Sequence, residues 1–188
     1  MLPDEPPDEL KRLAASRYQH TAWVHWTMAI DGRRRGWLEE IHHAKIRELL
    51  IHTCSRYFLL CPGYCLMPDH AHFLWMGLTE SSDQRNATKF FRTGWNRILA
   101  EDGVSLQKQS YDHVLDEDER NRTEFEDTLL YILKNPERAG LVEDWQEWPF
   151  LGAVASGYPD LDTRKKFGIY CGTMWKIHHR ERARLEGW

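Results

Sequence analysis

The sequence predicts an α+β fold in which helices cover an antiparallel sheet. A chain of 188 residues, 41% of them hydrophobic, is long enough to bury one sizeable core. Strand-like and helix-like segments follow each other in the order β-α-β-β-α-(β)-α. Two of the predicted strands are separated only by a tight turn, which favours an antiparallel hairpin rather than a parallel crossover.

The first elements follow an acidic, proline-rich segment. Residues 1–16 are predicted to be a flexible acidic lead-in. Residues 18–30 combine aromatic and β-branched side chains in rough alternation, which indicates a strand. After the turn sequence DGRRRG, the apolar residues of 37–54 recur at helical spacing among good helix formers.

The predicted hairpin joins residues 57–67 to residues 70–77. The first of these strands is expected to bulge or break at Pro62-Gly63, because proline removes a ladder hydrogen bond. The connection is the tight turn Met67-Pro68-Asp69.

The second half supplies two helices and a short strand. Residues 81–103 begin with cap residues and end at a glycine, and residues 110–115 are extended. A third helix is predicted over 116–135, because Pro136 disfavours helical geometry at the residue before it. Loops and short elements follow, and a basic C-terminal extension from 156 to 188 forms a last helix or an extended segment.

Bulk properties exclude several classes of protein. No apolar run reaches the ~18 residues that a membrane-spanning helix needs, and the N-terminus lacks the composition of a signal peptide. We therefore expect a cytoplasmic protein with reduced thiols. Cys61 and Cys65 lie four residues apart without a matching second pair, so a zinc site is a minor alternative.

Two histidines in YCLMPDHAHFLWMGL are the first chemical signal. Residues i and i+2 of a strand point to one face, so His70 and His72 should converge. Two neutral imidazoles are good ligands for a divalent transition metal, although a third ligand is needed. The structural alternative is a pair of polar residues on an exposed strand face.

Tyr131 and Asn135 are the second signal. They lie four residues apart, which places both on one face near the end of the third predicted helix. A tyrosine hydroxyl can act as a covalent nucleophile, and an amide oxygen can bind a metal. By themselves, these residues fit equally simple roles as a core tyrosine and a helix-terminal asparagine.

Taken together, YCLMPDHAHFLW and YILKNPERAGLV, with SYDHVL between them and WPFLG after them, closely resemble the REP-associated tyrosine transposases, a branch of the HUH single-strand DNA transposases. The resemblance covers roughly residues 18–152. It implies a ferredoxin-like HUH fold and assigns residues 17–155 to a catalytic domain. Where the family typically has Met-Pro-Asn-His-x-His, this chain has Asp69.

The resemblance implies a metal-dependent endonuclease and strand transferase that acts on single-stranded DNA beside hairpin-forming palindromic repeats. His70, His72 and Asn135 would hold Mg²⁺ or Mn²⁺, and the Tyr131 hydroxyl would attack phosphorus to leave a 5′-phosphotyrosine. A free 3′-hydroxyl could then rejoin the strands without ATP. By analogy with this branch, a monomer is expected rather than a dimer.

DNA recognition is predicted from local positive charge, because the net charge of −4 gives no overall attraction to a polyanion. Asp112 and His113 lie in a segment shared with the family, so they are expected near the active site or in a turn. The histidine pairs His42-His43 and His178-His179 are interpreted as surface residues. The predicted phosphate contacts are Arg33, Arg34, Arg35, Lys89, Arg92 and Arg97.

The sequence is also compatible with two other functions. A DNA-binding regulator with the same fold and no cleavage is favoured by the acidic net charge and by Asp116, where the resemblance predicts a basic residue. A metal-binding protein unrelated to DNA, built from the two histidines and a cysteine, is disfavoured by Tyr131 and Asn135.

Overall fold

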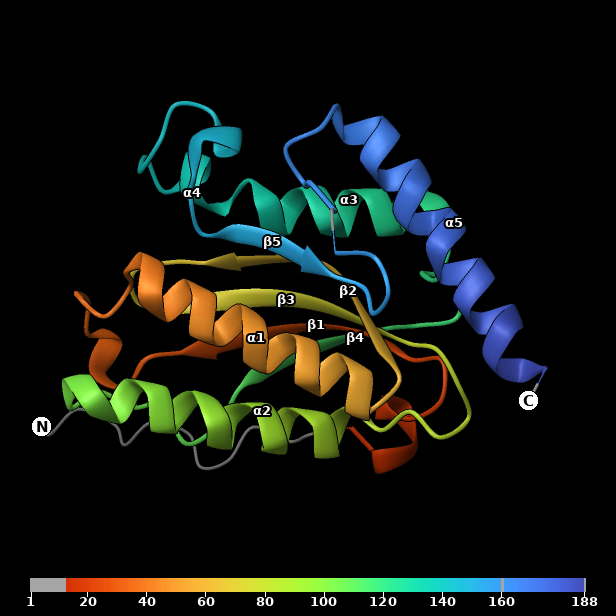
Figure 1. Cartoon of the computed structure of the whole chain (residues 1–188), viewed down its shortest axis with the longest axis horizontal. Coiled ribbons are helices and arrows are strands. Elements are labelled where there is room, and N and C mark those ends of the chain that lie inside the picture. The colour runs from red at the N-terminus through yellow and green to blue at the C-terminus, as the bar shows by residue number, and fades with distance from the viewer. Residues whose placement is uncertain (1–12, 160, 188) are drawn as a thin grey trace, which may run out of the picture.

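A five-stranded antiparallel sheet with helices on both faces organises the chain (Figure 1). The computed structural model describes residues 13–159 and 161–187. The strand order is β4-β1-β3-β2-β5, and every neighbouring pair is antiparallel. The strands are β1 (Trp23–Ala29), β2 (Leu59–Leu66), β3 (His70–Gly77), β4 (Tyr111–Leu115) and β5 (Leu151–Val154).

The helices form two layers, one on each face of the sheet. In Figure 1, α1 and α2 lie below the sheet, and α3 and α5 lie above it. The predicted antiparallel sheet sandwiched by helices is therefore confirmed. The helices are α1 (Glu40–Arg56), α2 (Gln84–Leu99), α3 (Arg122–Leu133), α4 (Asn135–Arg138) and α5 (Phe167–Glu186).

The two-residue period of the strands divides the core in two. In β1, Trp26 packs in the core shared with α1 and α2, whereas Trp23 packs in the core shared with α3 and α5. Helix α5 contributes Tyr170 and Met174 to that second core. Residues 156–188, predicted as an extension, thus include a helix that packs on the domain.

The predicted hairpin and bulge are confirmed. β2 and β3 pair antiparallel, and the register shifts between Leu60 and Gly63. The predicted strand over 18–30 is shorter than expected, because Tyr18 ends a 3₁₀ helix and β1 begins at Trp23. Of the predicted flexible segment 1–16, residues 1–12 lie outside the described residues.

The third predicted helix differs from the observed one at both ends. The Asn121 side chain accepts hydrogen bonds from the amides of Thr123 and Glu124, so the helix begins at Arg122 rather than at 116. α3 ends at Leu133, and Asn135 begins the short helix α4. Proline is tolerated in the first turn of a helix, so Pro136 starts the new helix where it was expected only to end the old one.

Helix α3 packs directly on the sheet at Gly63. A Cβ atom at this position would lie 2.2 Å from Leu129 Cδ1 of α3. Only glycine leaves room for this approach, which brings the residues of α3 near the strand surface. Gly63 therefore helps to set the height of α3 above β3.

The prediction for the histidine pairs is wrong for His42 and His178, which are both buried. His42 Nε2 lies 2.8 Å from an Asp102 carboxylate oxygen, and His178 packs edge-on against Trp23. Adjacent helical residues point about 100° apart, so one member of a pair can face the core while the other faces solvent. His179 is exposed, as expected.

The four cysteines are free and buried, which agrees with the expected thiols. Among the described residues, no helix combines the length and apolar character needed to cross a membrane.

Candidate active site

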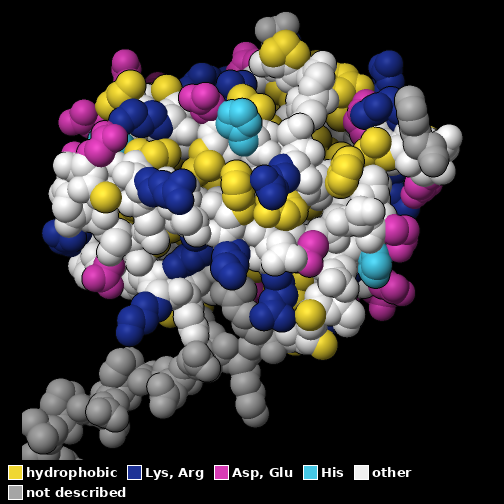
Figure 2. Space-filling model, turned by 60° about the horizontal axis from the view of Figure 1, so that its bottom comes forward, with side chains coloured by type: hydrophobic (Ala, Val, Ile, Leu, Met, Phe, Trp, Pro, Cys, Tyr) yellow, Lys and Arg dark blue, Asp and Glu magenta, His cyan; other side chains and the backbone are white. Residues whose placement is uncertain are grey.

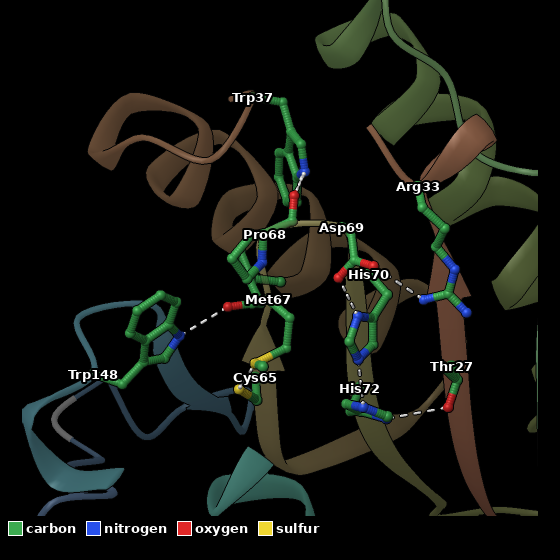
Figure 3. A network of polar contacts seen from close by, with 11 residues as sticks. Thr27, Arg33, Trp37, Cys65, Met67, Pro68, Asp69, His70, His72 and Trp148 are labelled. Carbon is green, nitrogen blue, oxygen red and sulfur yellow. Dashed lines mark hydrogen bonds and ion pairs between the residues drawn. The ribbon is translucent and has the colours of Figure 1, made fainter. Parts of the chain in front are cut away.

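The two histidines of β3 converge as the strand period predicts. His70 and His72 lie on the sheet face that α3 covers, and their Nε2 atoms are 3.1 Å apart (Figure 3). His72 is 6% exposed, and His70 is half-buried at the start of the strand. Two ligand atoms bound at right angles to one cation at about 2.1 Å would be separated by about 3 Å, so this spacing suits a shared divalent metal.

The other ring nitrogen of each histidine has its own partner. His70 Nδ1 lies 2.7 Å from Asp69 Oδ1, and Asp69 also pairs with Arg33 at 3.4 Å. His72 Nδ1 lies 3.1 Å from Thr27 Oγ1 and 3.1 Å from His25 Nε2. Such partners fix ring orientation in metal sites.

The turn that leads into β3, the strand that carries His70 and His72, is held by two indoles. The Trp37 indole donates to the Pro68 carbonyl at 2.8 Å, and the Trp148 indole donates to the Leu66 carbonyl at 2.8 Å (Figure 3). The Ile30 amide donates to the Asp69 carbonyl at 2.9 Å. These contacts reach the turn from three distant segments, so the position of Asp69 and His70 is set by the tertiary fold.

The electrostatics keep two of the imidazoles neutral. Burial, followed by the neighbouring charges of His25 and His70, lowers the pKa of His72 to about 3. Burial and then the charge of His113 lower the pKa of His25 to about 4. Partial burial raises the pKa of Asp69, but the hydrogen bond from His70 and the nearby positive charges outweigh it, so the net shift is downward. A neutral imidazole is the form in which histidine binds a metal, so His72 is ready to act as a ligand.

The donor set fits a divalent cation with an incomplete protein shell. His70 and His72 supply two imidazole nitrogens, and no cluster of three or more His, Cys, Asp or Glu side chains suited to a metal occurs in the described part of the chain. The remaining positions would fall to an amide oxygen, water or a phosphate oxygen. Nitrogen ligands suit Mn²⁺ better than Mg²⁺.

Tyr131 lies beside the histidines at the end of α3. Its ring centre is 5.8 Å from that of His25 and 6.3 Å from that of His72. Tyr131 is 45% exposed, and the Arg138 guanidinium lies 4.5 Å from its ring centre. The side chain is therefore not a core tyrosine, and a substrate can reach it.

Asn135 lies next to Tyr131 in space but outside α3. Its Nδ2 donates to the Tyr131 carbonyl at 2.9 Å and to the Ile132 carbonyl at 3.1 Å. These bonds orient the amide and leave its oxygen as the atom that could bind a cation. The metal role of Asn135 stays a prediction.

The predicted basic residues fall into two groups on different faces. Arg33 pairs with Asp69 in the turn before β3, whereas Arg34 donates to the Gly103 carbonyl at 2.5 Å, just beyond the end of α2. Lys89 and Arg97 are exposed on α2, on the opposite face of the sheet. Figure 2 shows Lys and Arg side chains gathered on the side of the molecule that carries α2.

Arg92 of α2 has a structural contact instead. Its guanidinium donates to the Gln107 and Lys108 carbonyls, the latter at 3.1 Å. This bond ties the loop before β4 to the helix, which is a different role from the predicted phosphate contact.

Asp112 and His113 point to opposite faces of β4. Asp112 pairs across the sheet with Trp26 and accepts a hydrogen bond from the Tyr18 hydroxyl at 2.5 Å, so it lies on the α2 side, away from the histidines. His113 lies opposite His25 in the β1–β4 ladder, on the face of the site. Of the two predicted neighbours, the structure brings only His113 to the site.

Three residues of the site carried no clear signal in the sequence. His25 and Thr27 meet His72 through the β1–β3 register, and Arg138 meets Tyr131 through the turn into α4. Alternation in β1 places His25 and Thr27 on one face, but which strand they face depends on a pairing that the sequence does not specify.

Comparisons with known proteins bear on the fold and on the family resemblance. No family model matches the chain. The chain is 25% identical over 140 residues to a protein of Haemophilus influenzae named as a REP-associated tyrosine transposase, with 66% of this chain and 76% of that protein covered. A solved structure of a REP-associated tyrosine transposase bound to a REP hairpin has a TM-score of 0.64 at 19% identity, with 77% of this chain and 82% of that chain covered. The resemblance predicted from the motifs is therefore confirmed, and so is the fold class.

Proposed function

We propose that this protein is a metal-dependent single-strand DNA endonuclease and strand transferase that cuts beside hairpin repeats through Tyr131. The observation that carries the proposal is the meeting of an exposed tyrosine with two converging imidazoles, from elements some sixty residues apart. The similar solved structure holds a REP hairpin, which supports a DNA hairpin as the substrate.

Tyr131 is the proposed nucleophile. Its hydroxyl loses a proton as its oxygen forms a bond to phosphorus, the phosphorus–O3′ bond breaks, and the 3′-oxygen takes up one proton and leaves as a hydroxyl. The 5′ end of the DNA stays on the enzyme as a phosphotyrosine. Because that ester keeps the energy of the broken linkage, a free 3′-hydroxyl can attack it and restore the strand.

His70 and His72 are the proposed metal ligands, with Asn135 as a third. A divalent cation bound there would polarise the scissile phosphate and stabilise its developing negative charge. Asp69 orients the His70 ring, and Arg33 pairs with Asp69, so the orientation of this ligand is fixed before the substrate binds. Arg138, over the Tyr131 ring, adds positive charge where a phosphate would approach.

The test is a covalent adduct on a denaturing gel. Labelled single-stranded hairpin DNA is incubated with the protein and Mn²⁺ or Mg²⁺, and the protein-bound label is measured for wild type, Tyr131→Phe and Tyr57→Phe. Tyr57 is a matched control, because it lies at the end of α1 on the other side of the sheet.

An adduct that Tyr131→Phe loses and Tyr57→Phe keeps, with hairpin binding equal in all three proteins, is the expected result. Hairpin binding without an adduct under either metal would replace the proposal with a non-cleaving DNA-binding regulator. Absence of hairpin binding would overturn both.

A further inference from the structure

Two side chains of the neighbouring strand β1, His25 and Thr27, lie on the same face of the sheet as His72. Thr27 lies opposite His72 in the β1–β3 ladder, and His25 precedes it by two residues on the same face. Thr27 Oγ1 and His25 Nε2 each lie 3.1 Å from His72 Nδ1. His72 is 6% exposed, so water has little access to this nitrogen.

The protonation of one ring nitrogen determines what the other can do. A neutral imidazole has one N–H and one lone pair. His72 can bind a cation through Nε2 only if its proton is on Nδ1, and a buried N–H needs an acceptor. For His70 the acceptor is the Asp69 carboxylate. For His72, the acceptors within reach are the hydroxyl of Thr27 and the ring nitrogen of His25.

We propose that His25 and Thr27 are positioning residues that hold His72 in the Nδ1–H tautomer and so aim its Nε2 at the metal. The inference rests on the proposed function, because it takes His72 as a metal ligand. The two histidines of the site would then be supported differently: His70 by an ionised carboxylate and His72 by two neutral acceptors. Neutral support fixes the ring without placing a second negative charge near the incoming phosphate.

The position of His25 argues for this role over simple packing. Trp23, two residues earlier on the same face, fills the core under α3 and α5 with an apolar ring. Burying an imidazole costs more free energy than burying an apolar ring, because its polar nitrogens must be hydrogen-bonded. His25 also touches the Tyr131 ring, so it links the ligand strand to the proposed nucleophile.

The test measures metal affinity without DNA, by calorimetry with Mn²⁺. The variants are His25→Phe, Thr27→Val, the double variant and His25→Gln, with His52→Gln as the control on the exposed face of α1. Removing such supporting partners typically weakens a metal site 10–100-fold. We expect about that loss in the double variant, a smaller loss in each single variant, and affinity within about threefold of wild type in His25→Gln, whose amide oxygen can accept the same bond. His52→Gln should match wild type.

A second measurement reads the tautomer itself. In the Zn²⁺-loaded wild type, the imidazole ¹⁵N spectrum should show the His72 proton on Nδ1, and the double variant should shift those resonances while its thermal unfolding midpoint shows that it is folded. A His72 proton on Nε2 in the loaded wild type would overturn the inference, and so would wild-type Mn²⁺ affinity in the double variant.

His72→Ala separates this inference from the proposed function. If wild type binds Mn²⁺ no more tightly than His72→Ala, the metal site of the proposed function fails and the inference falls with it. If His72→Ala loses binding while the His25 and Thr27 variants keep it, the metal site stands and only the positioning role is wrong.

Discussion

His178 should make the protein sensitive to mild acid. Its side chain is 2% exposed in the core between the sheet and α5, with the Trp23 ring edge-on at 5.6 Å. Burial, together with the nearby charges of His179 and Arg182, lowers the pKa of His178 to about 4 from 6.5. The folded state therefore holds His178 neutral at a pH where the unfolded chain would protonate it.

The sign and size of the effect follow from linkage. Between pH 6.5 and pH 4 the unfolded state binds more protons at this site, so stability falls as the pH falls. With pKa values of 6.5 unfolded and about 4 folded, the site costs about 0.2 kcal/mol at pH 7 and about 2 kcal/mol at pH 5. Because domains are stable by only about 5–15 kcal/mol, a loss of this size is readily measured.

The assay is urea unfolding followed by tryptophan fluorescence at pH 7 and pH 5, for wild type, His178→Leu and His179→Leu. Between the two pH values, His178→Leu should lose about 2 kcal/mol less of its unfolding free energy than wild type. His179→Leu should lose nearly as much as wild type, because burial, the largest cause of the lowered pKa of His178, is unchanged in that variant. Equal losses in His178→Leu and wild type would show that burial does not hold His178 neutral.

Three further changes test the contacts that position the site. Gly63→Ala should lower the free energy of unfolding in urea by about 1–3 kcal/mol, because its Cβ would overlap Leu129. Gly168→Ala, with open space around it, should lower it little, and equal effects of the two variants would contradict the close approach of α3. Trp148→Phe should cost about 1–2 kcal/mol by removing the donor to the Leu66 carbonyl, and an unchanged midpoint would show that this bond contributes nothing. Arg33→Ala should weaken hairpin binding and reduce the salt slope by about 1 in a filter-binding titration, whereas Arg56→Ala should leave both unchanged; a wild-type slope in Arg33→Ala would remove Arg33 from the DNA contacts.

Local pattern was enough to predict the histidine strand. Its predicted boundaries, 70–77, are those observed, because a short apolar run directly after a Pro-Asp turn favours the second strand of a hairpin. The same pattern fixed the common face of His70 and His72, since a two-residue period needs no knowledge of the rest of the fold.

Helix ends and side-chain environments were harder to predict. The helix over 116–135 was expected to be continuous, but the Asn121 cap shortened it and a new turn at Pro136 took Asn135 out of it. His178 is expected at the surface from the sequence, because adjacent histidines on a helix point in divergent directions and do not form a common site. Its burial depends on how α5 packs over β1, and that is a tertiary contact with no local signal.

The candidate site depends most on a single register, that of β1 against β3. Thr27 pairs with His72, which brings His25 to the same ring, and the chain of contacts continues to Tyr131 on α3. A slip by one residue would turn the opposite face of β1 toward the histidines and place the Trp26 ring where Thr27 lies. Trp26 is fully buried in the other core, with its indole bonded to Gln84, so a slip would also break that core. The packing of the α1–α2 side thus enforces the alignment on which the chemistry of the α3 side depends.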